Sequence, residues 1–164
     1  MEVSKIKKDH LYYLKRCIEI SKQAKKNGNT PFGALLVDDA GNILFEQENI
    51  EITEHICTGH AETTLAARAS KKYSKDFLWG CTLYTTAEPC AMCTGTIYWG
   101  NIGTIVFGMT ERRLLEFTGN NPQNPTFDLP AEAILVHGQK DIKVIGPFSE
   151  IEEAIANVHE GYWK

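Results

Sequence analysis

The sequence predicts an α/β protein, a three-layer α/β/α sandwich on a mixed, mostly parallel five-stranded sheet. Two observations lead to this prediction. Segments with apolar residues at helical spacing alternate with short apolar runs of strand type, and the first two such runs follow each other directly, as in a hairpin. This alternation is typical of a parallel sheet covered by helices on both faces. The 164 residues, 43% of them hydrophobic, suit a single domain spanning residues 1–164.

The first elements are a helix and a hairpin. Leucine and isoleucine recur at helical spacing over residues 5–26. The sequence NGN then ends this helix, because Gly28 readily adopts the left-handed conformation that follows a helix. Two apolar runs joined through DDAGN predict paired strands at residues 33–37 and 42–49.

The middle of the chain alternates between helix and strand. An alanine-rich segment predicts a helix over residues 61–73, and an apolar run predicts a strand at 81–88. A second helix is expected over 89–99, with Pro89 in its first turn, followed by a strand at 102–109.

The last third begins with a segment rich in asparagine and proline, which indicates a loop. Ser149 and Glu152 have the spacing of a capping box, which predicts the start of a final helix. The loop is predicted at residues 118–130, and a short helix at 128–138. A last strand is predicted at 142–148, and the final helix at 150–164.

Composition excludes several classes of protein. A net charge of −4 gives no general attraction to nucleic acid, and no apolar run reaches the ~18 residues of a membrane-spanning helix. The charged N-terminal stretch lacks the apolar core of a signal peptide. We therefore expect a cytoplasmic protein with no membrane partner. Its 5 cysteines, an odd number, favour metal or redox chemistry over a disulfide framework.

Two cysteines, Cys90 and Cys93, directly follow Pro89. Such a pair alone suits a redox site, half of a structural zinc site, or two ligands of a catalytic metal. His60 and Glu62, at the start of an earlier predicted helix, complete the pattern H-x-E…P-C-x-x-C, which is typical of zinc deaminases. Cysteines at a helix N-terminus ionise readily, because the helix dipole stabilises negative charge there.

These residues have complementary predicted roles. His60, Cys90 and Cys93 are expected to bind one Zn²⁺ per chain and to leave its fourth tetrahedral position open for water. The metal lowers the pKa of that water toward neutrality. Glu62 is not needed as a ligand and is predicted to be the catalytic residue that carries protons from the water to the ring and the departing amine.

The chain resembles the cytidine deaminase superfamily, within it the branch of guanine deaminases, yeast-type cytosine deaminases and tRNA adenosine deaminases. The resemblance covers residues 31–109, and the stretch AEPCAMCTGTIYW looks most similar to bacterial guanine deaminase. It implies a cytidine deaminase-like fold, a homodimer, and hydrolysis of an exocyclic amine to a carbonyl with release of ammonia.

The resemblance also implies substrate-binding residues. Asn49, 11 residues before His60, is expected to hydrogen-bond the base, and Phe32 in the PFGA segment to pack against it. The backbone around Ala61 is expected to orient the ring. Trp163 in the HEGYWK ending is expected either to stack on the base as part of a lid or to anchor the last helix.

For the substrate, we expect a small free nucleobase or nucleoside, with guanine-type bases favoured and cytosine or a related heterocycle as further candidates. Asn121 stands where related guanine deaminases carry an aspartate, which leaves the base open. The alternative is a tRNA adenosine deaminase. RNA is the less favoured partner because the last helix is acidic, although Arg112 and Arg113 keep it in consideration.

Two non-deaminase interpretations compete. Cys57 lies three residues before His60, so C-x-x-H with C-x-x-C can close a four-ligand structural zinc module that leaves no position for water. A thioredoxin-like redox pair is the other, but it has no need of His60 and Glu62. Cys17 and Cys81 are expected to be core residues.

Overall fold

The computed structural model describes residues 9–119 and 121–163 and contains a five-stranded sheet in the order β2-β1-β3-β4-β5. β1 pairs antiparallel with β2 and with β3, whereas β3, β4 and β5 run parallel. The predicted mixed sheet is therefore confirmed. The strands are β1 (Gly33–Val37), β2 (Ile43–Glu48), β3 (Thr82–Ala87), β4 (Thr104–Met109) and β5 (Lys143–Ile145).

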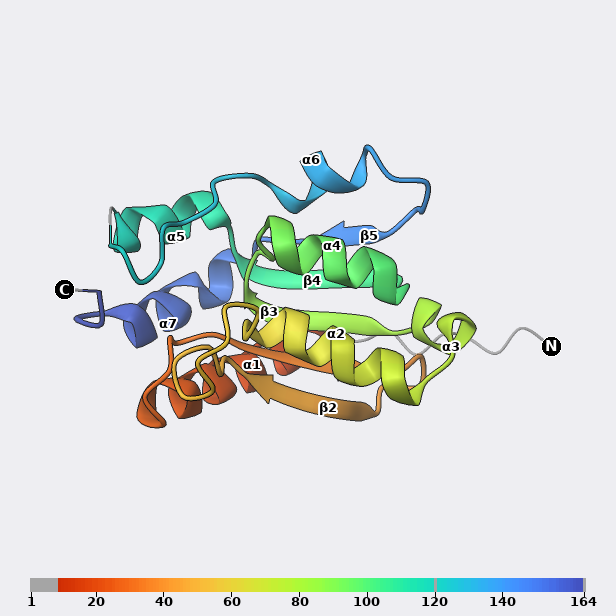
Figure 1. Ribbon diagram of the computed structural model, residues 1–164, viewed down its shortest axis with the longest axis horizontal. Helices are drawn as coiled ribbons and strands as arrows, with labels where there is room; N and C mark the ends of the chain where they lie inside the picture. Colours follow the sequence, from red (N-terminus) through yellow and green to blue (C-terminus); the bar gives the residue numbers. More distant parts are fainter. Residues whose placement is uncertain (1–8, 120, 164) are drawn as a thin grey trace.

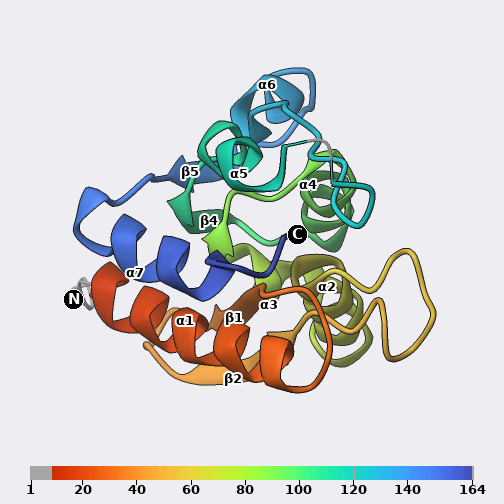
Figure 2. The ribbon, with the colours of Figure 1, turned by 90° about the vertical axis from the view of Figure 1, so that its left-hand side faces the viewer.

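Helices cover both faces of this sheet, as predicted. Figure 2 shows α1 and α7 on one side of the strands and α2 and α4 on the other, and Figure 1 shows the same layers from the α2 and α4 side. The helices are α1 (His10–Lys26), α2 (Ala61–Lys72), α3 (Lys75–Trp79), α4 (Ala91–Gly100), α5 (Glu111–Thr118), α6 (Ala131–Leu135) and α7 (Ser149–His159). The start of the first predicted helix, residues 5–8, lies outside the described residues.

The central strands are buried on both faces, which explains their continuous apolar sequences. Leu35 and Tyr84 belong to the core beneath α1 and α7, whereas Leu36 and Leu83, their neighbours along the strands, belong to the core beneath α2 and α4. This alternation follows from the strand geometry, in which successive side chains point to opposite faces.

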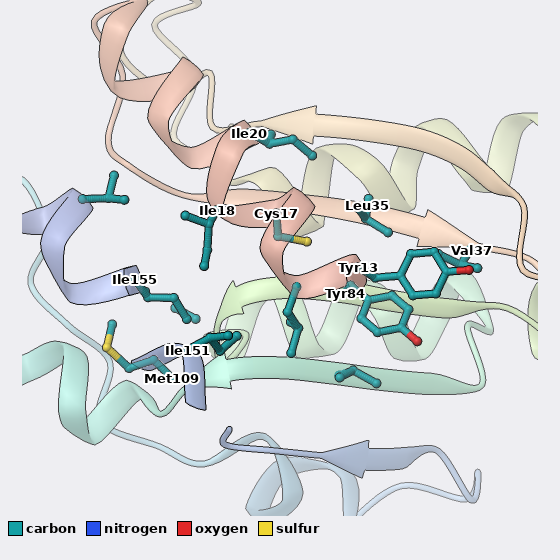
Figure 3. Packing of buried hydrophobic residues seen from close by; sticks show 14 of the residues in the cluster. Tyr13, Cys17, Ile18, Ile20, Leu35, Val37, Tyr84, Met109, Ile151 and Ile155 are labelled. Atoms are coloured by element: carbon teal, nitrogen blue, oxygen red, sulfur yellow. The ribbon is translucent and has the colours of Figure 1, made fainter. Parts of the chain in front are cut away.

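α1 packs closely against β1. Cys17 is fully buried in this interface, as predicted, among the residues drawn in Figure 3. A Cβ atom on Gly33 would lie 2.6 Å from the carbonyl oxygen of Cys17, so only glycine permits this approach of helix to strand. Cys81 is buried in the opposite core, also as predicted.

Three predicted details are corrected or extended. Cys90 is the N-cap of α4, so Pro89 precedes the helix and is not in its first turn. The capping box at Ser149 is absent, because α7 begins at Ser149 after Phe148, and the Glu152 carboxylate instead accepts a hydrogen bond from Arg113 at 2.8 Å. α5 directly follows β4, in a segment for which no element was predicted.

None of the helices in the described ranges combines the length and apolar character that crossing a membrane requires.

Candidate active site

The predicted metal ligands meet where two helices begin on the same face of the sheet. His60 is the N-cap of α2, and Cys90 is the N-cap of α4. Both residues have extended backbones, and neither uses its side chain to cap its own helix, so both side chains are available to each other. α2 packs against α4, which brings these two N-termini together.

The three ligand atoms are spaced as a zinc ion requires. Nδ1 of His60 lies 3.6 Å from Sγ of Cys90 and 3.5 Å from Sγ of Cys93. Tetrahedral Zn²⁺ with its usual bond lengths to nitrogen and sulfur separates those atoms by about 3.6 Å. The donor set of one imidazole and two thiols therefore fits Zn²⁺.

The site has three protein ligands, not four. Among residues 9–119 and 121–163, the group of side chains that can share a metal consists of His60, Cys90 and Cys93. Cys57 does not belong to this group and is exposed. The closed module with Cys57 as a fourth ligand is therefore not formed, and the ligands remain accessible from the cavity that His60 and Cys90 line.

Replacing Cys57 by serine is expected to leave zinc content within about twofold of wild type, because the exposed thiol is not part of the metal group. Zinc content per chain, measured by atomic emission after gel filtration, tests this. Loss of the metal from Cys57→Ser would instead establish a fourth ligand and a structural site.

Electrostatics favour a thiolate at Cys90. Hydrogen bonds from Cys93 and from His60 lower the pKa of Cys90 to about 4. The same interaction with Cys90 raises the pKa of His60 to about 9, and sharing a hydrogen bond with Cys90 raises the pKa of Cys93. The hydroxyl of Thr63 donates to Sγ of Cys93 at 3.2 Å, which stabilises negative charge on that sulfur as well.

The other nitrogen of the ligand histidine faces a carboxylate. Nε2 of His60 lies 3.8 Å from Oε2 of Glu51. Glu51 is held in turn by the Thr30 hydroxyl at 3.0 Å and the Asn49 amide at 3.4 Å. A carboxylate at the far nitrogen of a metal-binding histidine orients the ring and raises its basicity. Glu51 lies on the side of His60 where such a carboxylate acts, at 3.8 Å, and the sequence pattern did not reveal it.

Glu62 lies deep beside the metal ligands. Its side chain is buried, accepts a hydrogen bond from the Thr85 hydroxyl, and has Oε2 3.4 Å from Sγ of Cys93. Burial raises the pKa of Glu62 above that of an ordinary glutamate, while the hydrogen bond from Thr85 opposes this change. A raised pKa makes the Glu62 carboxylate a better proton acceptor than an ordinary glutamate.

A cavity of about 310 Å³ opens above the ligands. Phe32 and Leu114 form apolar parts of its wall, and residues 123–127 form another wall. The acidic residues that line it are Glu51, Glu62, Glu88 and Glu111. Neither lysine nor arginine lines this cavity in the described part of the chain. The site is therefore small, partly apolar and acidic.

Two of these glutamates follow the carboxyl ends of neighbouring parallel strands. Glu88 comes after β3, and Glu111 begins α5 after β4. The Glu88 carboxylate accepts backbone N–H groups from Glu111 at 3.1 Å and Ala131 at 3.0 Å. Burial raises the pKa of Glu111 to about 9, and the nearby charges of Cys90, Glu62 and Glu88 add to this effect. Neither residue was predicted, although polar residues directly after parallel strands were the available signal.

The predicted base-binding residues have different surroundings. Asn49 and Phe32 line the cavity, and Asn49 also accepts a hydrogen bond from the Glu51 backbone N–H at 3.0 Å. Ala61 is fully buried as the first residue of α2. Trp163 is not among the cavity-lining residues that the structure describes; its ring centroid lies 6.3 Å from that of Phe32. Direct contact of Trp163 with a base stays a prediction.

His159 joins the C-terminal segment to the body of the protein. The indole N–H of Trp163 donates to Nδ1 of His159 at 3.0 Å, and the His159 ring packs against Phe32 at 5.2 Å between centroids. Nε2 of His159 is buried without a hydrogen-bond partner among the described residues. Burial lowers the pKa of His159 to about 4, and the positive charge of Lys25 contributes.

This buried histidine predicts a loss of stability in mild acid. Unfolding exposes His159 and restores its ordinary pKa of about 6.5, so between pH 6.5 and 4 the unfolded chain binds a proton that the folded chain does not. The free energy of unfolding should fall by roughly 3 kcal/mol as the pH falls through this interval. Urea unfolding of wild type and His159→Phe at several pH values checks this prediction. The free energy of unfolding of His159→Phe should lack this dependence on pH, and the exposed-site control His137→Gln should keep it.

Comparison with known proteins agrees with this geometry. Residues 7–109 match the family described as the cytidine and deoxycytidylate deaminase zinc-binding region. The chain belongs to this deaminase family. Zn²⁺ is therefore the cofactor of the His60, Cys90 and Cys93 group.

Relatives of this deaminase differ in their substrates. The chain is 34% identical over 163 residues to a probable cytosine deaminase of Schizosaccharomyces pombe, covering 99% of this chain and 98% of the relative. It is 36% identical over 112 residues to the tRNA-specific adenosine deaminase of Haemophilus influenzae, covering 68% and 65%. The structure of guanine deaminase from Bacillus subtilis superposes with a TM-score of 0.62 at 28% identity, covering 96% of this chain and 98% of that one.

The deaminase site assigns a task to each group. Zn²⁺ held by His60, Cys90 and Cys93 would supply Lewis-acid activation of a water. The Glu62 carboxyl group lines the cavity beside these ligands, where it could exchange protons with a water or a substrate. The Thr85 hydroxyl holds the Glu62 carboxyl group in place, and the Glu51 carboxylate lies beside the His60 ring. The result is hydrolysis of a C–NH₂ group to C=O with release of ammonia.

Proposed function

We propose that this enzyme deaminates a small free nucleobase, with guanine-type bases favoured. The observation that carries the proposal is the cavity itself. It has a volume of about 310 Å³, at the lower end for ligand pockets, and four glutamates but no described lysine or arginine line it. Carboxyl oxygens accept hydrogen bonds from N–H donors, so the cavity suits a base rich in ring N–H and amino groups.

Deamination of adenosine in tRNA is less well supported. Binding RNA requires free cationic groups near the site, because phosphate neutralisation supplies much of the affinity. The arginines nearest the cavity are already paired: Arg112 contacts Asp128 at 2.9 Å, and Arg113 contacts Glu152 at 2.8 Å as well as Glu116. These pairs leave little positive charge for a phosphate backbone.

Cytosine is the second candidate. The observation that favours it is the match to the probable cytosine deaminase of Schizosaccharomyces pombe, which spans 99% of this chain. Cytosine also carries an exocyclic amine and a ring N–H, so the acidic cavity suits it too. The wall formed by residues 123–127 and the predicted base contacts of Asn49 and Phe32 are the features expected to decide between the two bases.

Two further properties are part of the proposal. A homodimer is supported by exposed apolar side chains on α4 and directly after its neighbour α6, since Trp99 is 74% exposed and Val136 75%. Light scattering should then give twice the mass of one chain, and a monomer at micromolar concentration would refute the dimer.

Location of the protein in a reducing cytoplasm is supported because Cys90 and Cys93 bind zinc only as reduced thiolates. Zinc that stays bound after aeration without added reductant would remove that argument.

A substrate panel tests the central proposal. Ammonia release from the zinc-loaded protein is measured with guanine, cytosine, isocytosine, adenine, their nucleosides and a tRNA anticodon stem-loop, with Glu62→Ala as the blank. We expect turnover on a free base, guanine or isocytosine foremost, and at least about 100-fold lower kcat/KM on the stem-loop. Preferential turnover of the stem-loop would overturn the proposal in favour of tRNA editing.

A further inference from the structure

One acidic side chain in the cavity has no described partner. Glu111 is 6% exposed and lines the same cavity as His60, Glu62 and Cys90. No hydrogen bond or ion pair connects its carboxyl oxygens with the residues in ranges 9–119 and 121–163, although its backbone N–H donates to Glu88. A mostly buried carboxyl group without a protein partner is costly, so an N–H donor that enters the cavity would stabilise it.

The neighbouring glutamates differ from Glu111 in this respect. Both oxygens of Glu88 accept backbone N–H groups, from Glu111 and Ala131, so Glu88 ties the start of α5 to the start of α6. Glu51 supports His60, and Glu62 is bound by Thr85. Structural and catalytic roles therefore account for those three carboxyl groups and leave Glu111 to face the cavity contents.

The fold holds Glu111 firmly. It is the first residue of α5, whose N-cap Thr110 accepts a hydrogen bond from the Arg113 N–H at 3.0 Å. Its own backbone is fixed to Glu88 across the ends of β3 and β4. A carboxyl group on such a fixed backbone can discriminate between ligands, because it cannot move to another hydrogen-bond partner.

We propose that Glu111 is a specificity-determining residue, whose carboxyl group binds an N–H donor of the heterocycle other than the reacting amine. The proposal rests on the proposed nucleobase deamination and narrows its substrate class to bases that carry such a second donor. Guanine, isocytosine and cytosine have a ring N–H of this kind. The analogue 4-aminopyrimidine keeps the exocyclic amine of cytosine but has no ring N–H. The analogue 2-aminopurine keeps the exocyclic amine and the imidazole N–H of guanine but lacks the lactam N1–H, so the guanine pair tests that donor.

The test compares matched substrates on matched variants. Wild type, Glu111→Ala, Glu111→Gln and the control Glu116→Gln are assayed on guanine against 2-aminopurine, and on cytosine against 4-aminopyrimidine, with zinc content measured for each. Glu116 is an exposed residue of the same helix. For the preferred base of wild type, Glu111→Ala should lower kcat/KM about 100-fold, mainly through KM, and change the value for its analogue less than about threefold.

A binding measurement separates recognition from turnover. In the Glu62→Ala background, calorimetric titration with the preferred base should show weaker binding when Glu111→Ala is added, by about 100-fold. Glu111→Gln preserves the shape of the side chain and one acceptor oxygen, so it should retain zinc and bind the base about 10-fold more weakly. This variant replaces Glu111→Ala as the test if the alanine variant does not fold. Glu116→Gln should behave as wild type.

The outcomes distinguish the inference from the function on which it rests. Equal losses on base and analogue, or unchanged affinity in the Glu62→Ala background, would overturn the role of Glu111 while leaving the deaminase proposal intact. Absence of wild-type turnover on every free base would overturn the proposed function, and the inference with it.

Discussion

Replacing Glu62 by alanine is expected to lower turnover by roughly 10²–10⁴-fold while zinc stays bound, because proton transfer by a positioned carboxyl group contributes about that much. Glu62 is not one of the three metal-binding side chains, and its oxygens contact Thr85 and Cys93 inside the site. Steady-state ammonia release and zinc content, measured on the same preparation, check both halves of the prediction.

A second substitution separates chemistry from packing. Glu62→Gln keeps the side-chain volume and an oxygen that can accept from Thr85, but it cannot carry a proton, so it should be as inactive as the alanine variant. The exposed Glu19→Gln, in α1, should retain wild-type activity and serves as the control. A Glu62→Gln enzyme that turns over within tenfold of wild type would contradict the assigned role.

Replacing Cys90 by alanine is expected to abolish zinc binding, and turnover with it. Two ligands, His60 and Cys93, would remain of the three. Loss of a ligand should cost more than the ~10–100-fold in affinity that follows the loss of a group that merely orients one. Zinc content after gel filtration should fall close to zero, whereas Cys57→Ser, the matched cysteine control, should keep the metal.

Thermal unfolding gives a readout that does not depend on activity. Bound Zn²⁺ at a thousandfold excess over its Kd stabilises the folded state by about 4 kcal/mol, which corresponds to a shift in Tm on the order of 10 °C for a chain of this size. A chelator should therefore lower the Tm of wild type and leave that of Cys90→Ala unchanged. A Tm of Cys90→Ala that still falls on chelation would show that the metal is held elsewhere.

Much of the fold could be predicted because its signals are local. Helical spacing, NGN at the end of α1, and apolar runs for β1, β3 and β4 all act within a few residues. The metal ligands were predictable for the same reason. The spacing of Cys90 and Cys93 places both at the start of one helix, and His60 with Glu62 occupies the start of another.

One error arose where a tertiary contact replaced a local one. Ser149 and Glu152 have the spacing of a capping box, but Arg113 from α5 binds the Glu152 carboxylate. The other error was a missed local signal. Residues 111–118 consist mostly of strong helix formers behind the N-cap Thr110, and Leu114 is buried in the core beneath α1 and α7.

By itself, the sequence determined the zinc-binding group, the carboxyl group beside it and the layered sheet that supports them. These depend on residue identity and short spacing, which folding does not alter. The tertiary structure alone decided which other groups share the cavity. Glu88 and Glu111 meet because β3 and β4 lie parallel and end together, and residues 123–127, in the loop that follows α5, line the same cavity. Strand pairing joins residues that lie far apart in the chain, so the sequence pattern alone did not show that these groups share one cavity.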